Sequence, residues 1–380
     1  MEMEKHVRDR YSEGATRVVE ALCCPVSYDT DLLKILPQEI IDRDYGCGDP
    51  SRYVQPGDTV LDLGSGGGKI CYMAAQLVGM GGRVIGVDMN DDMLSLARQY
   101  QQEIAEKLGE DRVLFHKGRI QDLALSLDKV SDYLATNPVT DLASVDRFEQ
   151  WMVAQRSQNP MIADGSVDLV ISNCVLNLVD DAFKQQLVEE IYRVVRPGGR
   201  VAISDIVSDG VIPDSLKADP ALWSGCISGA FEESEFVRLF REVGFTGVAF
   251  DKWDEKPWQV VEGIEFRSVT LTAVKDGLSA QTEQSDGGHA VIYRGPMAVV
   301  EDDLGNWYPA GVRIAVSQEI YHRLGKAPFT NDFIRLSPQT PKEPTPYTLP
   351  PGTYRPAEET RGGGASSDGE SGGCGPTGCC

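Results

Sequence analysis

The sequence predicts an α/β fold built on a doubly wound, mostly parallel sheet, with a small β-rich domain after it. Short apolar runs alternate with helical stretches between residues 58 and 206, and a glycine-rich turn follows the first run. Near residue 286 the pattern changes to short strands separated by turn residues. Alternating strands and helices are typical of βαβ units, whose helices cover both faces of a parallel sheet.

The expected elements follow from apolar runs of strand length and from amphipathic stretches of helical period. We expect strands at Thr59–Leu63, Arg83–Asp88, Val113–His116, Val167–Ser172 and Arg200–Asp205. We expect helices at Ile70–Val78, Asp92–Glu106 and Ala182–Val195, the last ending at Arg196-Pro197-Gly198-Gly199, since proline and glycine terminate helices. A helix near Ser234–Val243 and strands near Val248–Phe250 and Arg267–Ala273 follow.

Composition divides the chain into five segments. Residues 1–50 are expected to be helical and loop-like, and they carry Cys23 and Cys24. Residues 51–206 are expected to form the cofactor-binding domain, with inserted helices at 125–160. Residues 207–285 would complete the catalytic domain, and 286–338 would form the β-rich domain. Residues 339–380 are rich in Pro, Gly and Ser, end in cysteines and are expected to be disordered.

The bulk composition excludes several classes of protein. The net charge of −22 repels phosphate backbones, so no nucleic-acid partner is expected. The sequence has no apolar run of membrane-spanning length, and its charged start lacks the core of a signal peptide, so we expect a cytoplasmic protein without a membrane partner. In that reducing compartment, nine cysteines do not indicate a disulfide framework.

A cofactor site is predicted where the run Val60–Lys69 joins a strand, a glycine turn and a helix start. Glycines let the backbone approach a ligand closely, and a helix N-terminus supplies unpaired N–H donors. Lys69 replaces the third glycine of a dinucleotide motif, and Asp62 stands where methyltransferases that use S-adenosylmethionine carry an acid. We expect this cofactor to contact Asp62, Gly64, Ser65, Gly66, Asp88, Met89, Ile120, Gln121 and Asn173; the alternative is a glycine turn without a ligand.

Three cysteines are expected to share the rim of the sheet with that cofactor. Ligands of open α/β sheets bind outside the carboxyl ends of the strands. Cys174 lies at such an end, Cys226 follows the fifth strand, and Cys47 precedes the first strand in a glycine-rich turn. Converging thiols favour a soft, thiophilic element, whereas a lone strand-end cysteine is more often a packing residue.

The remaining cysteines and the histidines have other expected roles. Cys71 lies inside a helix and is expected to be buried core; the tail residues Cys374, Cys379 and Cys380 either carry a soft ion or are spare thiols. The four histidines have no ligand spacing, and the sequence has no H-E-x-x-H or C-x-x-C pattern, so no structural zinc site is expected.

Five runs carry a resemblance to a known family: Tyr45–Gly48, Leu61–Gly66, Cys71-Tyr72, Ser172–Leu178 and Leu222–Ala230. Through them the chain resembles the arsenite methyltransferase family over about residues 8–275, and more loosely to 338. The resemblance implies a class I methyltransferase, Rossmann-like fold, with 207–285 as the arsenic-binding segment. It implies that Cys174 and Cys226 hold trivalent arsenic. It also implies that Cys47 is either a third ligand or a redox partner that forms a disulfide with Cys23 or Cys24, and that thioredoxin or glutathione reduces this disulfide.

The resemblance also implies an activity, the methylation of arsenite and methylated arsenicals for arsenic detoxification. Arsenic bound by three sulfurs keeps a lone pair that attacks the sulfonium methyl in line, so no general base is needed and catalysis rests on positioning. We expect a small-molecule substrate and a monomer. Two alternatives stay open, a methyltransferase of a small organic acceptor with structural cysteines and a metalloid-binding protein that is not an enzyme.

Overall fold

The computed structural model describes residues 2–17, 26–278, 282–338 and 340–360. It divides into two compact units, Met1–Asp276 and Gly277–Cys380, and each has a hydrophobic core of its own. Among the described residues, no helix has both the length and the apolar character needed to cross a membrane.

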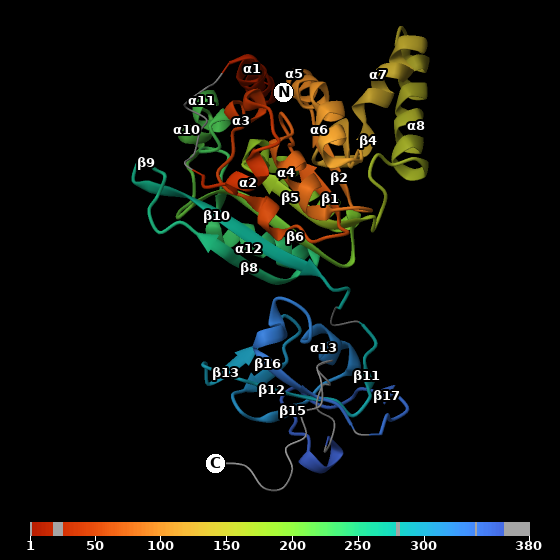
Figure 1. Ribbon diagram of the computed structural model, residues 1–380, viewed down its shortest axis with the longest axis vertical. Helices are drawn as coiled ribbons and strands as arrows, with labels where there is room; N and C mark the ends of the chain where they lie inside the picture. The colour runs from red at the N-terminus through yellow and green to blue at the C-terminus, as the bar shows by residue number, and fades with distance from the viewer. Residues whose placement is uncertain (1, 18–25, 279–281, 339, 361–380) are drawn as a thin grey trace. The chain divides into compact units, whose positions relative to one another are not determined.

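The first unit is built on one large sheet, whose main path runs β4-β3-β2-β1-β5-β6-β10-β8 (Figure 1). Strands β3, β2, β1, β5 and β6 pair in parallel, while β4, β10 and β8 join antiparallel. This arrangement confirms the predicted doubly wound, mostly parallel sheet. The strand bounds are β1 Thr59–Leu63, β2 Arg83–Asp88, β3 Val113–Arg119, β4 Asp122–Ser126, β5 Val167–Asn173, β6 Val195–Ser208, β7 Phe231–Glu232, β8 Thr246–Trp253, β9 Gln259–Val261 and β10 Ile264–Lys275.

Helices cover both faces of this sheet, because alternate residues of a strand point to opposite sides. One core packs Leu61 and Leu63 of β1 against α9 and α12, and the other packs Val60 of β1 against α4 and α5. The helix bounds are α1 Glu2–Thr16, α2 Thr30–Leu33, α3 Gln38–Asp42, α4 Lys69–Val78, α5 Asp91–Gln99, α6 Gln101–Leu108, α9 Lys184–Val194, α10 Asp214–Lys217, α11 Pro220–Ser224 and α12 Glu233–Val243.

Two further helices, α7 (Leu127–Thr136) and α8 (Leu142–Gln158), occupy the segment between β4 and β5. They stack on each other through Tyr133 and Trp151, whose ring centroids are 4.3 Å apart. An ion pair of 2.9 Å between Arg156 and Asp122 joins α8 to β4. Figure 1 shows this helical pair beyond the edge of the sheet.

Two predicted boundaries are wrong. The helix expected at Asp92–Glu106 is divided into α5 and α6 at Tyr100, whose φ of −102° and ψ of 1° leave the helical range. The Arg196–Gly199 turn was expected to precede the fifth strand, but β6 already begins at Val195. Sheet pairing explains this difference, because Val195 pairs with Val167 on β5 and Gly199 pairs with Lys275 on β10.

The second unit is a small antiparallel β structure around a three-stranded sheet of order β15-β12-β16. A hairpin of β13 and β14 and a short pair of β11 and β17 accompany it. The bounds are β11 Ser285–Asp286, β12 Ala290–Tyr293, β13 Val299–Glu301, β14 Trp307–Pro309, β15 Arg313–Ala315, α13 Gln318–Arg323, β16 Phe333–Leu336 and β17 Thr345–Pro346.

Residues 340–360, which composition assigned to a disordered tail, are part of this second unit. The backbone N–H of Ala315 donates to the carbonyl of Thr353 at 2.8 Å, and the Tyr347 hydroxyl donates to the carbonyl of Ala315 at 2.8 Å. Arg355 is buried and donates to carboxylates of Asp286 and Glu359 at 2.8 Å each. This segment is ordered although it is rich in proline, because its backbone and its polar and aromatic side chains form hydrogen bonds with the rest of the second unit.

Candidate active site

A cavity opens at the carboxyl ends of the central parallel strands of the first unit. Its walls include all nine residues expected to contact the cofactor, which come from the turns after β1, β2 and β3 and from the end of β5. The cavity also has walls that the sequence did not indicate, above all Val7, Arg8 and Tyr11 of α1. A charged N-terminal helix has no motif to reveal such a role.

The turn after β1 is shaped for close approach of a ligand. Gly64 and Gly66 have φ of 70° and 50°, and a Cβ on Gly64 would lie 2.4 Å from Val175. Asp88 supports the turn, because its carboxylate accepts the N–H of Gly66 at 2.9 Å and that of Asn90 at 2.8 Å. Ser65 Oγ is buried and has no hydrogen-bond partner among the described residues, so it is free to bind a polar group of the cofactor.

Asp62 lies beneath this turn in an apolar setting. Burial raises the pKa of the Asp62 carboxyl to about 7, and the nearby Asp44 and Asp88 act in the same direction. Cys71 on α4 donates a hydrogen bond from its thiol to Asp62 at 3.2 Å. Cys71 is buried, as expected of a core residue, and in addition it orients the acid of the cofactor site.

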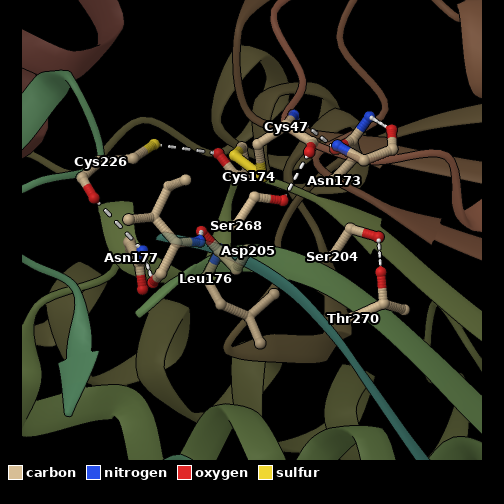
Figure 2. Close-up of a disulfide and its surroundings, with 12 residues drawn as sticks. Cys47, Asn173, Cys174, Leu176, Asn177, Ser204, Asp205, Cys226, Ser268 and Thr270 are labelled. Atoms are coloured by element: carbon tan, nitrogen blue, oxygen red, sulfur yellow. Dashed lines mark hydrogen bonds between the residues drawn. A yellow bond between two sulfur atoms is a disulfide. The ribbon is translucent and has the colours of Figure 1, made fainter. Parts of the chain in front are cut away.

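Three of the predicted sulfur residues meet next to this cavity (Figure 2). Cys47 and Cys174 form a disulfide, with Cα atoms 5.8 Å apart. The Cys226 thiol donates a hydrogen bond to the Cys174 carbonyl at 3.2 Å. All three lie in one buried apolar cluster, and Asn173 and Val175, the neighbours of Cys174, line the cavity itself. The rim therefore brings together three cysteines that are distant in sequence.

The backbone at two of these cysteines is unusual. Cys174 has φ of 59° and Cys226 has φ of 61°, the left-handed region that favours glycine. Such conformations cost about 1–3 kcal/mol and persist where surrounding structure enforces them, often at functional sites. At Cys174 the enforcing contact is the hydrogen bond from its N–H to the Ser204 carbonyl of β6, at 2.8 Å.

Asn173 holds the loop that carries Cys47. Its Oδ1 accepts the N–H groups of Cys47 and Gly48 at 2.9 and 3.0 Å, and its Nδ2 donates to the Gly48 carbonyl at 2.8 Å. Ser268 on β10 donates to the Cys47 carbonyl at 2.7 Å. Asn173 was expected only to contact the cofactor; it lines the cavity and also places one sulfur beside another.

Asp205 is a functional candidate that sequence reasoning missed. A carboxylate oxygen of Asp205 and the sulfurs of Cys47 and Cys174 all lie within 4.8 Å of one another. Burial raises the pKa of Asp205 to about 7, although its carboxylate accepts N–H bonds from Leu176 and Ile206 at 2.9 and 2.8 Å. The available signal was an acid within the mostly apolar stretch at 201–207.

The structure does not describe the five remaining cysteines. Cys23, Cys24, Cys374, Cys379 and Cys380 lie outside the described residues. The redox partner expected for Cys47 was Cys23 or Cys24, whereas the structure bonds Cys47 to Cys174.

Comparison with known proteins agrees with this geometry. Residues 55–149 and 146–244 match a family model described as a methyltransferase domain, and 280–365 match one described as a domain of unknown function. An arsenite methyltransferase of Aquipseudomonas alcaligenes is 33% identical over 77% of this chain and 78% of that protein. The chain belongs to the arsenite methyltransferase family.

Other members of the arsenite methyltransferase family are similar over comparable lengths. The arsenite methyltransferase of Homo sapiens is 28% identical over 83% of this chain and 76% of that protein. The crystal structure of CrArsM, an arsenic (III) S-adenosylmethionine methyltransferase from Chlamydomonas reinhardtii, matches with a TM-score of 0.56 and 27% identity, over 85% of this chain and 99% of that one. The predicted family, the class I fold and an S-adenosylmethionine-dependent methyltransferase are confirmed.

Proposed function

We propose that this enzyme methylates trivalent arsenic held by the thiolates of Cys47, Cys174 and Cys226. The observation that carries the proposal is that these three residues lie together beside the candidate cofactor cavity, whose lining includes Asn173 and Val175 on either side of Cys174. Thiolates are soft ligands and suit a soft trivalent metalloid. The arsenite methyltransferases of other organisms support arsenic as the substrate.

The chemistry of binding balances without an added base. Arsenite exchanges three hydroxyl groups for three thiols and releases three water molecules, so each thiol proton leaves with a hydroxide. The lone pair of three-coordinate arsenic then forms the As–C bond while the C–S bond of the donor breaks, and the donor sulfur keeps that electron pair. S-adenosylmethionine supplies the electrophilic methyl group. The protein contributes position, holding arsenic and methyl carbon about 3–3.5 Å apart.

Methylation raises arsenic formally to the pentavalent state, and two electrons return it to the trivalent state. Two of the sulfur ligands supply them when their As–S bonds break and one S–S bond forms. No proton is released in this step, because the thiol protons left in water when arsenic bound. The bond between Cys47 and Cys174 supports this role, since it joins two of the proposed ligands. A thiol reductant, thioredoxin or glutathione, then restores both thiols by exchange. Arsenic detoxification is the physiological role that follows from this cycle.

The test is conversion of arsenite in the presence of S-adenosylmethionine and a thiol reductant, with arsenic species identified by chromatography and element detection. Wild-type protein should form methylated arsenic, and Cys174→Ser and Cys226→Ser should each reduce the rate at least about 100-fold, since each removes one ligand that holds arsenic in position. Ser157→Ala is the control, because Ser157 is exposed on α8 and its hydroxyl donates to the Val153 carbonyl of the same helix at 3.0 Å; it should behave as wild type. Unchanged turnover in either ligand variant would refute the ligand set, and methylation of only an organic acceptor would refute the substrate.

A further inference from the structure

The loop that carries Cys226 is fastened to the segment that begins with Cys174. That segment contains a short helical turn, Leu176–Leu178, and Asn177 in its middle is fully buried. The side-chain Nδ2 of Asn177 donates to the carbonyl of Ile206 on β6 at 2.7 Å and to the carbonyl of Cys226 at 3.3 Å (Figure 2). One amide group therefore joins the Cys226 loop both to the sheet and to the turn that follows Cys174.

Lys184 is a second attachment of this loop. It is the first residue of α9 and is buried, its Nζ donates to the Gly229 carbonyl at 2.7 Å, and an ion pair of 2.6 Å with Asp181 neutralises its charge. Gly229 lies so close to the segment that a Cβ there would be 2.1 Å from the Asn177 carbonyl oxygen. Two side chains of one continuous segment, 174–184, thus hold the loop, at Cys226 and at Gly229.

The contact between the two sulfur residues themselves changes when arsenic binds. The Cys226 thiol donates its hydrogen to the Cys174 carbonyl at 3.2 Å, and that hydrogen leaves when the sulfur becomes an arsenic ligand. The bond from Asn177 ends on the backbone carbonyl of Cys226 and involves no sulfur, so it is compatible with both states. It also supports the left-handed backbone of Cys226, whose φ is 61°.

We propose that Asn177 is a positioning residue for Cys226, and that it sets the separation of the Cys226 and Cys174 sulfurs at which both bind one arsenic atom. The proposal rests on the proposed function, because it takes both cysteines as arsenic ligands. The described residues that line the cofactor cavity include Val175 and Leu178 but not Asn177. Replacement of Asn177 should therefore affect arsenic binding rather than binding of the methyl donor.

Asn177→Asp is the sharpest substitution, because it keeps the size of the side chain and replaces the donor Nδ2 by an oxygen. That oxygen would face two carbonyl oxygens, which accept hydrogen bonds and cannot donate them. The other amide atom, Oδ1, is buried and has no hydrogen-bond partner among the described residues, so the substitution removes no further bond. Each lost bond corresponds to about a 2- to 10-fold change in an equilibrium constant.

The experiment measures arsenite affinity by equilibrium dialysis of the full-length protein, kept reduced with a phosphine because free thiols would compete for arsenite. Asn177→Asp should weaken arsenite binding at least about 10-fold, since it removes two hydrogen bonds. Binding of S-adenosylhomocysteine, measured by calorimetry, should stay within about twofold of wild type. Asn159→Asp is the matched control at an exposed residue after α8, and it should keep the wild-type arsenite affinity. Asn177→Asp with the arsenite affinity of wild type would overturn the proposal.

A double-mutant cycle with Cys226→Ser separates positioning from a general loss of structure. If Asn177 acts by placing the Cys226 sulfur, it has no sulfur left to place in Cys226→Ser, so adding Asn177→Asp should weaken arsenite binding by less than about twofold further. A general effect on folding or on Cys174 would instead multiply the two losses. Equal factors in the two backgrounds would overturn the proposal.

Lys184→Met is a second variant that acts on the same loop from its other attachment. It removes the bond to the Gly229 carbonyl and keeps a long side chain beside the Phe231 ring. It should weaken arsenite binding about 2- to 10-fold when Cys226 is present and by less than about twofold in Cys226→Ser. If Asn177→Asp does not bind S-adenosylhomocysteine, this second cycle decides, and an unchanged arsenite affinity in Lys184→Met would then overturn the proposal.

Cys226→Ser on its own separates this inference from the proposed function. If Cys226→Ser binds arsenite as tightly as wild type does, the ligand assignment itself is refuted. If Cys226→Ser loses affinity while Asn177→Asp keeps it, only the role of Asn177 is refuted.

Discussion

Replacement of Asn173 by alanine tests whether one side chain holds Cys47 beside Cys174. The amide oxygen of Asn173 accepts the N–H groups of Cys47 and Gly48 at 2.9 and 3.0 Å, and its Nδ2 donates to the Gly48 carbonyl at 2.8 Å. These groups are buried, so truncation leaves two donors and one acceptor without their partner. The loop should then leave its position beside β5.

The magnitude follows from the cost of unsatisfied groups. Each buried polar group left without a hydrogen bond costs about 1–3 kcal/mol. If water satisfies one of the three groups after the loop relaxes, the two others still destabilise the closed loop by at least about 2 kcal/mol. Since 1.36 kcal/mol corresponds to a factor of ten, the closed loop should become about 30-fold less favourable relative to the open loop.

The assay is the equilibrium of the Cys47–Cys174 disulfide in glutathione buffers, quantified by mass spectrometry of the linked peptides after alkylation. The disulfide requires the closed loop, so its midpoint in Asn173→Ala should shift by about 30-fold toward the reduced form. Thr270→Val is the matched control, because it removes a nearby 2.9 Å hydrogen bond to Ser204 but none of the hydrogen bonds between Asn173 and the Cys47 loop. A midpoint within twofold of wild type in Asn173→Ala would refute the reasoning.

Two further predictions concern stability. Burial raises the pKa of Asp62 and of Asp205 to about 7, above the value of about 4 in an unfolded chain. The folded state therefore binds protons more tightly than the unfolded state does. As a result, both groups lower the free energy of unfolding as the pH rises from about 4 to 7. Asp205→Asn should flatten part of that fall in urea titrations between about pH 4 and 7, and an unchanged slope would contradict the pKa shift. Truncation after Pro338 removes Tyr347, Thr353 and Arg355 and should expose the second unit to limited proteolysis; resistance equal to that of the full chain would contradict their role.

Local patterns determined the parts of the fold that could be predicted. The bounds of β1 and β2 follow from short apolar runs bounded by turn residues, and the glycine turn after β1 has a backbone requirement that only glycine meets easily. The rim position of Cys174 follows from topology, since it comes directly after the last residue of a parallel strand.

Long-range contacts determined what could not be predicted. The Cys47–Cys174 bond joins residues 127 positions apart, and nothing in the sequence distinguishes Cys174 from Cys23 or Cys24 as the partner of Cys47. The part that α1 takes in the cavity wall depends on single side chains such as Tyr11, which leave no periodic signal in the sequence. The burial of Asp205 also depends on long-range contacts. From the local sequence, an acid in a strand is expected to be exposed at the sheet edge, but the neighbouring strands bury Asp205.

The left-handed backbone at Cys174 and Cys226 limits how this chemistry can be moved between proteins. Many methyltransferases share the fold, so grafting two cysteines onto the corresponding positions would seem a direct route to a new metalloid enzyme. At ordinary backbone angles, however, the Cα–Cβ bonds would leave the chain in other directions, and the sulfurs would not meet. A graft therefore has to transfer the two turns, with the contacts that enforce them, rather than the two side chains.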